Sequence, residues 1–384
     1  MRNWLSFLLI ILFPVTIWAQ EMMVQGRVVD AETGEALPYV SIYVEEGKGT
    51  LSNDDGDFKL TVDKSTVLRF SYIGYERMVI KTAEMPDTIR LKPYSISMRE
   101  VTVQAENIDK ILKQTKRNLK HDFKKCGKWT RKYFFRTYTE MDEGTYIAEA
   151  FMKAYSVVNI RSATIQSGLE GCDTEGNGGT LNMFDSNIHR LVEVAPMTYD
   201  SKFWQDAIKP LKSLSALHKC YRTKLMYMQS EDGKALYKIE FKWKKKQSAS
   251  WPFRDINITG TAYVDAETCR LLRFDGSCNN CTVYTGWLLS LPTAINFHLE
   301  YDYSQGAASI SHLAIHGGNS LTYYRALLFA IEPDEKKPGK IKDSGANMVT
   351  AIKKAGFKAK LWKEYDIVKR TKEEERAAFG DKKE

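Results

Sequence analysis

The side chains that most often carry chemistry are sparse in this sequence of 384 residues. Its six histidines are His121, His189, His218, His298, His312 and His316. None begins an H-E-x-x-H run, in which two histidines on one helical face bind zinc. His312 and His316 have the four-residue spacing of a helical metal pair, but the residues around them predict a strand, where four residues span about 13 Å. One ion cannot bridge that distance, so the sequence predicts no metal site.

Six cysteines form a second group: Cys126, Cys172, Cys220, Cys269, Cys278 and Cys281. Cys278 and Cys281 have the C-x-x-C spacing of redox and metal sites, but no second C-x-x-C completes a zinc set. Cys269 precedes them across a predicted strand and turn. A local disulfide among these three and free thiols in a loop both stay open, and both are favoured over metal or redox chemistry. The pairing of the six cysteines cannot be chosen from sequence.

Motifs for nucleophilic catalysis and phosphate binding are missing. The sequence contains no G-x-S-x-G, no G-x-x-x-x-G-K-[ST] and no G-x-G-x-x-G. The many carboxylates include no pair that the sequence alone marks as glycosidase-like. We therefore expect no enzyme activity, no catalytic residue and no cofactor, although an unrecognised hydrolase stays open as an alternative.

The N-terminus has the pattern of a cleaved signal peptide. Arg2 supplies a positive charge, the segment from Leu5 to Val15 is almost continuously apolar, and Ala19 offers a small residue for cleavage. The apolar stretch is shorter than the about 20 residues that a membrane-spanning helix needs. We expect residues 1–19 to be removed, which leaves an exported chain, periplasmic or associated with the outer membrane, with no transmembrane helix.

The net charge of +8 is spread along the chain. Its densest run, Lys242 to Lys246, fits a solvated strand end whose lysines block edge pairing. We expect no nucleic-acid partner. An anionic glycan or a lipid headgroup would suit a basic exported protein better.

Residues 22–105 predict a β-sandwich, because about seven short segments alternate apolar and polar residues between turn signals. These segments are 23–30, 39–44, 58–62, 67–72, 77–80, 89–91 and 100–103. The acidic loop Asn53 to Asp57 lacks the spacing and closing glutamate of an EF-hand. Turn chemistry explains its Asn, Asp and Gly residues better than a weak ion site does.

Four motifs of this module carry a resemblance: Gly26 to Asp30, Thr33 to Ile42, Leu51 to Phe58 and Phe70 to Tyr75. Together they resemble the carboxypeptidase regulatory-like domain, which is common in exported proteins of the Bacteroidetes type. The resemblance implies a seven-stranded antiparallel, transthyretin-like sandwich. It implies no catalysis, since the family is named after an accessory domain beside a peptidase.

Residues 107–333 predict an α+β domain with a large antiparallel sheet, so the whole chain is expected to be mainly β. An apolar stripe from Ile108 to Leu119 predicts a helix capped by Asn107. Two more helices are expected at 184–194 and 203–217, with a glycine-rich loop at 168–179. Strands are expected at 132–141, 146–158, 237–243, 259–265, 271–274, 295–303, 309–315 and 323–331.

This second region is similar to the region that follows the same module in Bacteroidetes envelope proteins of unknown function. The helix near Ile108, the strand Arg131 to Tyr138 and the hairpin Gly260 to Thr268 carry the similarity. The hairpin is also reminiscent of the curved sheets of lipoprotein carriers.

Residues 334–384 are a charged linker and tail, in which Trp362, Tyr365 and Ile367 form an apolar island. Thr371 and Glu374 have the spacing of a capping box. The island is expected to dock on the body of the protein, and a partner-binding tail is the alternative.

Three functions are compatible with this organisation. The first is a non-catalytic accessory protein of the envelope that binds a protein, glycan or lipid. The second is a periplasmic carrier of lipid or acyl chains on a concave apolar sheet, and the third is the unrecognised hydrolase.

Overall fold

The structure is a computed structural model that describes most of the chain in several stretches. The described residues are 21–44, 49–96, 105–126, 128–141, 144–155, 157–158, 160, 162–172, 221–244, 257–284, 290–318, 322–333, 335–336, 348–365 and 367–380. The predicted signal peptide, the strand at 100–103 and the helices at 184–194 and 203–217 lie outside them.

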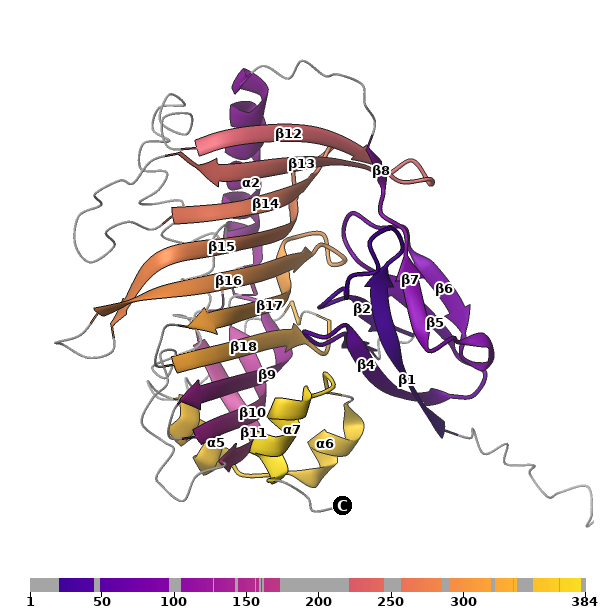
Figure 1. The fold of residues 1–384 in the computed structure, drawn as a ribbon, viewed down its shortest axis with the longest axis vertical. Helices are drawn as coiled ribbons and strands as arrows, with labels where there is room; N and C mark the ends of the chain where they lie inside the picture. The colour runs from indigo at the N-terminus through magenta and orange to yellow at the C-terminus, as the bar shows by residue number, and fades with distance from the viewer. Residues whose placement is uncertain are drawn as a thin grey trace, which may run out of the picture.

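The N-terminal domain, here called the sandwich, consists of two small sheets packed face to face (Figure 1). One sheet has the order β4-β1-β7 and the other the order β3-β2-β5-β6. Six of the seven predicted strands are confirmed, and β3 is a strand that was not predicted. β1 and β7 run parallel, whereas every other pair in the sandwich is antiparallel. The strands are β1 (Glu21–Asp30), β2 (Ser41–Tyr43), β3 (Gly49–Leu51), β4 (Asp57–Asp63), β5 (Val67–Ser71), β6 (Met78–Lys81) and β7 (Thr88–Leu91), with the short helix η1 (Thr82–Glu84) before β7.

The second domain is built on one large sheet with the order β11-β10-β9-β18-β17-β16-β15-β14-β13-β12-β8. All of its pairs are antiparallel, as predicted. Its strands are β8 (Ser95–Ile96), β9 (Thr130–Met141), β10 (Gly144–Tyr155), β11 (Ser162–Cys172), β12 (Tyr221–Gln229), β13 (Ala235–Trp243), β14 (Asn257–Asp265), β15 (Leu271–Tyr284), β16 (Ser290–Asp302), β17 (Ser309–Gly318) and β18 (Thr322–Ala330). Because β8 directly follows the sandwich in the chain, it ties the sandwich to one edge of the sheet.

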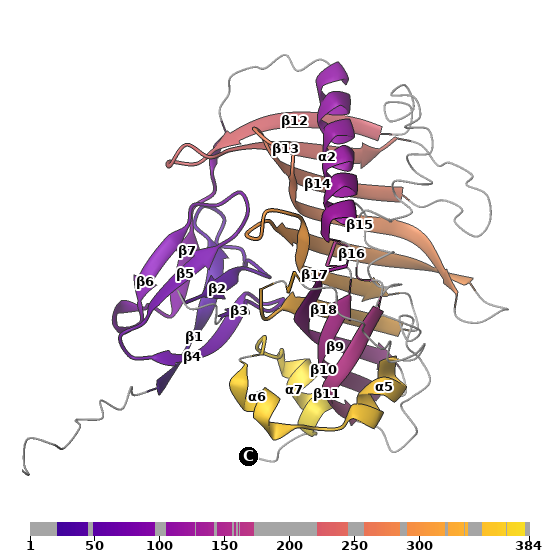
Figure 2. The ribbon, with the colours of Figure 1, turned by 180° about the vertical axis from the view of Figure 1, so that it is seen from behind.

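The two faces of the large sheet have different coverings. The inner face, which includes Phe274, Leu299 and Leu313, packs against helix α2 (Ala105–Cys126) in one apolar core. The outer face carries the residues that alternate with these and is covered by the sandwich. Figure 2 shows α2 lying across the sheet on the side away from the viewer of Figure 1. The predicted helix is confirmed, although it begins at Ala105 and includes Asn107, because Ala105 and Glu106 are themselves good helix formers.

The C-terminal segment wraps around the edge strand β11. Helix α5 (Met348–Ala355) lies against the inner side, whereas α6 (Ala359–Glu364) and α7 (Lys372–Phe379) lie on the outer side. Two glycines of β11 make this possible. A Cβ at Gly168 would lie 2.5 Å from a side-chain carbon of Ile352, and one at Gly171 would lie 2.5 Å from the carbonyl oxygen of Ala377.

These contacts correct one prediction and confirm two. Residues 168–172 belong to a strand and not to a glycine-rich loop, since their glycines serve the close approach of helices. The docking of the tail is confirmed, because the Trp362 ring packs 4.9 Å from that of Phe151. The capping box of Thr371 and Glu374 is confirmed at the start of α7.

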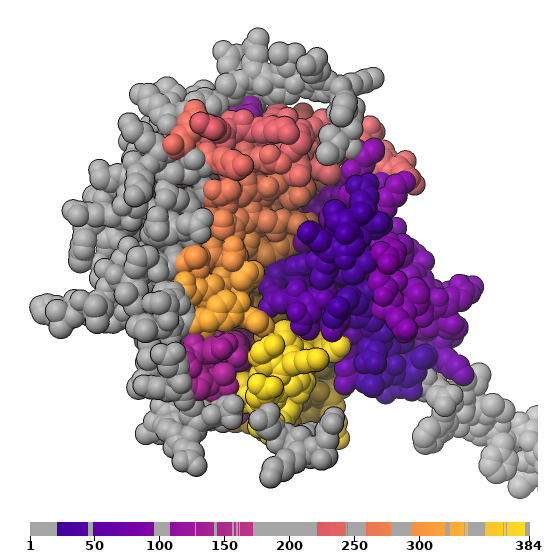
Figure 3. All heavy atoms as spheres, viewed as in Figure 1, coloured from indigo at the N-terminus to yellow at the C-terminus, as the bar shows by residue number. Residues whose placement is uncertain are grey.

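The space-filling view shows how closely the parts meet. The sandwich lies directly against the sheet and the C-terminal helices, and all three meet in one area (Figure 3). Among the described helices, none is both long enough and apolar enough to cross a membrane.

Candidate functional site

The outer face of the sheet buries an unusual number of polar residues beneath the sandwich. Strand alternation places Arg273 and Asp275 of β15 on the same face as His298 and Glu300 of β16. The register adds β17, because Asp275 pairs with His298 and Glu300 pairs with His312. We call Asp275, His298, Glu300 and His312 the histidine cluster.

The two histidines of this cluster meet head to head. Their Nε2 atoms are 2.8 Å apart, and their rings are nearly parallel, at 13°, with centroids 4.9 Å apart. His298 Nδ1 lies 2.6 Å from Asp275 Oδ1. That carboxylate is an acceptor, so Nδ1 of His298 carries a proton and the neutral ring directs the lone pair of Nε2 at His312.

Burial governs the protonation of both rings. It lowers the pKa of His298, against the opposing charge of Asp275, and it lowers the pKa of His312 further, with the charge of His298 adding to the effect. Burial would raise the pKa of Asp275, but Arg273 and His298 outweigh it and hold that pKa below its usual range. The cluster therefore combines neutral imidazoles with an ionised aspartate.

Glu300 differs from the other members of the cluster in the hydrogen bonding of its side chain. Its Oε2 is buried and lacks a hydrogen-bond partner among the described residues, and it lies 3.7 Å from His312 Nε2. Burial raises the pKa of Glu300 to about 8, and Arg273 offsets only part of that effect. An unsatisfied buried carboxyl oxygen is costly and calls for a physical reason.

The sandwich forms the roof of the histidine cluster. The rings of Tyr39 and Tyr72 lie 5.0 and 6.1 Å from that of His298. Arg273 holds the roof in place, since its Nη1 donates to the carbonyl of Ile73 at 2.8 Å and its guanidinium lies 3.8 Å from the centre of the Tyr72 ring. The cluster is thus enclosed between two domains.

A second buried group, the arginine cluster, fastens the C-terminal segment to the outer face. It consists of Arg136, Glu149, Arg370 and Glu374. Arg136 donates to Glu149 at 2.6 Å, to Glu374 at 3.1 Å and to the Val368 carbonyl at 2.6 Å. Arg370 donates to both oxygens of Glu149. Burial would raise the pKa of Glu149, but the two arginines outweigh it and lower that pKa.

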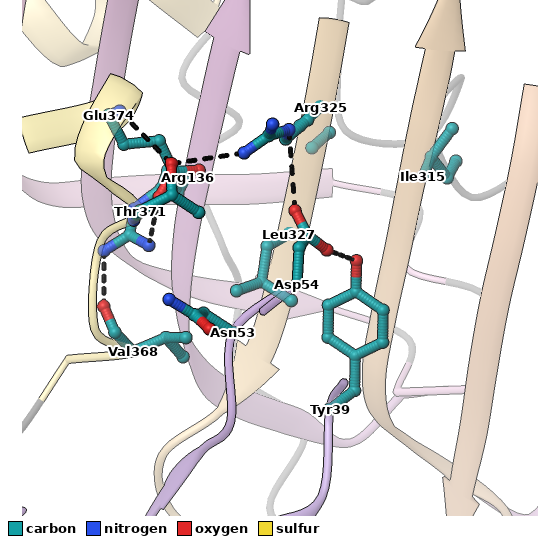
Figure 4. A pocket seen from close by; sticks show the side chains of 11 residues that line it. Tyr39, Asn53, Asp54, Arg136, Ile315, Arg325, Leu327, Val368, Thr371 and Glu374 are labelled. Carbon is teal, nitrogen blue, oxygen red and sulfur yellow. Dashed lines mark hydrogen bonds and ion pairs between the residues drawn. The ribbon is translucent and has the colours of Figure 1, made fainter. Parts of the chain in front are cut away.

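A small cavity lies between the sandwich and the arginine cluster (Figure 4). Asp54 of the sandwich accepts a hydrogen bond from Tyr39 and lies 3.5 Å from Arg325 of β18. Arg325 also donates to Thr371 at 3.3 Å. The cavity has a volume of about 20 Å³, which is room for about one water molecule and not for a substrate.

The acidic loop is a turn, as predicted. Asn53 Oδ1 accepts from the backbone N–H groups of Asp55 and Asp57 at 3.0 and 2.9 Å, and Gly56 has a φ of 78°. Asp54 and Asp57 pair with Arg325, Arg27 and Lys369, so these two carboxylates are engaged in domain docking.

The other candidate residues are scattered. His312 and His316 are four residues apart on one strand, as predicted, while His121 is exposed on α2. Cys126 is buried and its Sγ donates to the carbonyl of Asp122 at 2.9 Å, whereas Cys269 is half-buried and burial raises the pKa of its thiol. The side chains of Cys172, Cys220, Cys278 and Cys281, and residues His189 and His218, lie outside the described part. Sequence reasoning missed the pairing of His298 with His312, because only the strand register brings them together.

Comparison with known proteins identifies the N-terminal domain. Residues 24–103 match the family described as CarboxypepD_reg-like domain, which confirms the resemblance for this part of the chain. No curated protein matches the sequence. The crystal structure of an outer membrane lipoprotein-sorting protein domain from Vibrio parahaemolyticus aligns over 65% of this chain and 100% of its own, with 11% identity and a TM-score of 0.28. A similarity at that TM-score carries no weight for function.

Proposed function

We propose that the protein is an exported, non-catalytic accessory protein of the cell envelope that binds a protein, glycan or lipid partner. The observation that supports this proposal most directly is the closed interface beneath its regulatory-like domain. Arg273 and Asp54 join the two domains there, and the cavity beside the arginine cluster takes about one water molecule. A binding role would therefore use the exposed surface of the two joined domains.

The interface also explains why an accessory domain would be joined to this sheet. Buried ion pairs contribute little net stability but penalise every arrangement that leaves a charge unpaired. Asp54, Arg273 and Asp57 accordingly favour one orientation of the sandwich on the sheet. A protein that presents a composite surface to a partner needs its two parts in one fixed arrangement.

Affinity capture from the native envelope tests the proposal. The tagged full chain is cross-linked in intact cells, the envelope is fractionated, and captured proteins, glycans and lipids are quantified against an unrelated tagged exported protein. We expect one envelope component in near-stoichiometric amount. Recovery of the chain alone from the non-envelope fraction would contradict the accessory role. Recovery with acyl lipids only would favour the carrier alternative.

A further inference from the structure

The histidine cluster has the donor set of a metal centre. Two imidazole nitrogens and one carboxylate oxygen, from His298, His312 and Glu300, all lie within 4.8 Å of one another. Imidazole and carboxylate donors suit divalent transition metals, and zinc in particular is bound by such sets. The three residues are respectively 6%, 0% and 9% exposed, so the donors are shielded from competing water.

The hydrogen bond of His298 to Asp275 also suits a metal ligand. Asp275 accepts the Nδ1 proton of His298, which leaves the Nε2 lone pair directed into the cluster. A carboxylate that orients a ligating histidine in this way is the usual outer partner in zinc sites. His312 can offer its own Nε2 lone pair by placing its proton on Nδ1, which lies 3.4 Å from Ser311 Oγ.

The side chain of Glu300 is an independent indication of a cation site. Its Oε2 has no hydrogen-bond partner among the described residues, although it is buried on the same side as the two histidines. A buried carboxyl oxygen without a hydrogen bond is unfavourable, and a bound cation would give it a partner. Structural packing alone would favour an apolar or amide side chain here.

Two of the three donor–donor distances are close to those around a bound zinc ion. Two ligands of a tetrahedral zinc ion with bonds of about 2.0–2.1 Å lie about 3.3 Å apart. The two Nε2 atoms are 2.8 Å apart, and Glu300 Oε2 is 3.7 Å from His312 Nε2. From this geometry we propose that His298, Glu300 and His312 bind one divalent transition-metal ion, with zinc the best fit, and that Asp275 is the positioning residue of the site.

The location assigns this ion a structural role beyond the proposed binding function. Its ligands come from the adjacent strands β16 and β17, and Tyr39 and Tyr72 of the sandwich lie over them. Three protein ligands leave one position of a tetrahedron for water. A zinc ion here stabilises the face on which the sandwich docks, and it can exchange only when the sandwich moves.

The test measures zinc binding to the untagged full chain. The protein is stripped with a chelator, titrated with zinc by calorimetry, and dialysed before its metal content is measured. Cobalt serves as a spectroscopic probe, because its visible bands report tetrahedral coordination. We expect about one zinc per chain and a rise in the thermal midpoint of roughly 5 °C with excess zinc.

Three substitutions locate the site. Glu300→Gln keeps size and shape and removes only the charged donor, so it should fold and bind zinc at least 100-fold more weakly, and His312→Gln should abolish binding. His316→Gln is the matched control, since it lies on the same strand and the same face but outside the cluster. It should bind zinc as the unmodified chain does.

Each outcome decides the proposal. Stoichiometric zinc that is lost in Glu300→Gln and kept in His316→Gln supports it. Failure of the unmodified chain to bind zinc, or equal binding by Glu300→Gln, overturns it, and the two histidines are then a hydrogen-bonded neutral pair. Loss of zinc binding would leave the capture of an envelope partner unaffected, so the two proposals fail separately.

Discussion

The two faces of the large sheet bury their residues by different means, although the same strands supply both. On β15, β16 and β17 the inner positions are Phe274, Leu299 and Leu313, which are fully buried against the core of α2. The intervening outer positions are Arg273, His298 and His312, which are also buried. One face is held by apolar contact and the other by paired polar groups.

The two faces differ less in how strongly they bind the element packed on them than in how specifically they fix its position. Apolar packing is non-directional, so α2 could tolerate small shifts across the inner face. Every polar pair on the outer face has one correct geometry, and a misplaced sandwich would leave charges buried without partners. The outer face should therefore be the more sensitive to pH and ions, and the inner face the more sensitive to lost volume.

The largest loss of stability is expected when side-chain volume is removed from the inner face. The ring of Phe274 is fully buried and covers the backbone at Gly260 and Gly276, where an added Cβ would lie 2.7 and 2.8 Å from it. Phe274→Ala should lower the free energy of unfolding by about 4 kcal/mol, with little dependence on pH. Urea denaturation at several pH values measures both quantities. Met23→Ala, at a side chain that is 55% exposed, is the control and should change stability by less than about 0.5 kcal/mol.

The next largest loss of stability is expected when one charge is removed from the arginine cluster. Glu149→Gln leaves Arg136 and Arg370 without the carboxylate that both contact, so stability at neutral pH should fall by about 3 kcal/mol. The folded pKa of Glu149 is lowered from 4.5, so its ionised form stabilises the protein above pH 4.5. That contribution is lost as the pH falls below 4.5 through the folded value.

The variant should accordingly lose less stability than the unmodified protein on acidification below pH 4.5. Thermal melts across the acid range give the comparison. Glu240→Gln is the matched control, because Glu240 is more exposed and the distance in its ion pair with Lys238 is 3.6 Å. Parallel acid profiles for Glu149→Gln and the unmodified chain would show that the outer face does not depend on this carboxylate.

The sequence predicted the elements better than the site, for a physical reason. Alternation in 295–303 is a local property, and it predicted both the strand and the apolar face that β16 presents to α2. The histidine cluster depends on which residues pair across β15, β16 and β17. A register shift of one residue would send His312 to the other face, and the bulge beside Glu300 that sets the observed register has no sequence signature.

The glycines of β11 also show that local sequence patterns do not predict contacts between distant segments. Gly168 and Gly171 predicted a loop because glycine weakens an isolated strand. Their role became visible only once α5 and α7 were in place against them, and those helices are about 200 residues away in sequence. Contacts between distant segments are invisible to local patterns. The capping box at Thr371 was predictable because both of its partners lie within one turn.

The proposed zinc site gives a sharper test of the outer face. Asp275→Asn retains an oxygen that can accept from His298 but removes the charge that orients and polarises the ring. Zinc should bind 10- to 100-fold more weakly, at unchanged stoichiometry under saturation, as measured by competitive titration on folded protein. Unchanged affinity would mean that Asp275 serves only Arg273, with which it also pairs at 2.6 Å.

The smallest effect concerns the cap that joins α7 to the outer face. Thr371 Oγ1 accepts from the Glu374 backbone N–H and also receives a hydrogen bond from Arg325, which itself lies beside Asp54 of the sandwich. Thr371→Ala should cost about 1 kcal/mol, as the loss of a helix cap does. Thr371→Ser keeps the hydroxyl and should restore nearly all of the lost stability.

If Thr371→Ala instead costs as much stability as Glu149→Gln, the cap is part of the polar network that orients the sandwich. The outer face then acts as one cooperative unit from the C-terminal helix to the regulatory-like domain. Hydrogen exchange of the amides in α7 and in the 53–57 turn would separate these cases, because a local cap loss exposes only the helix.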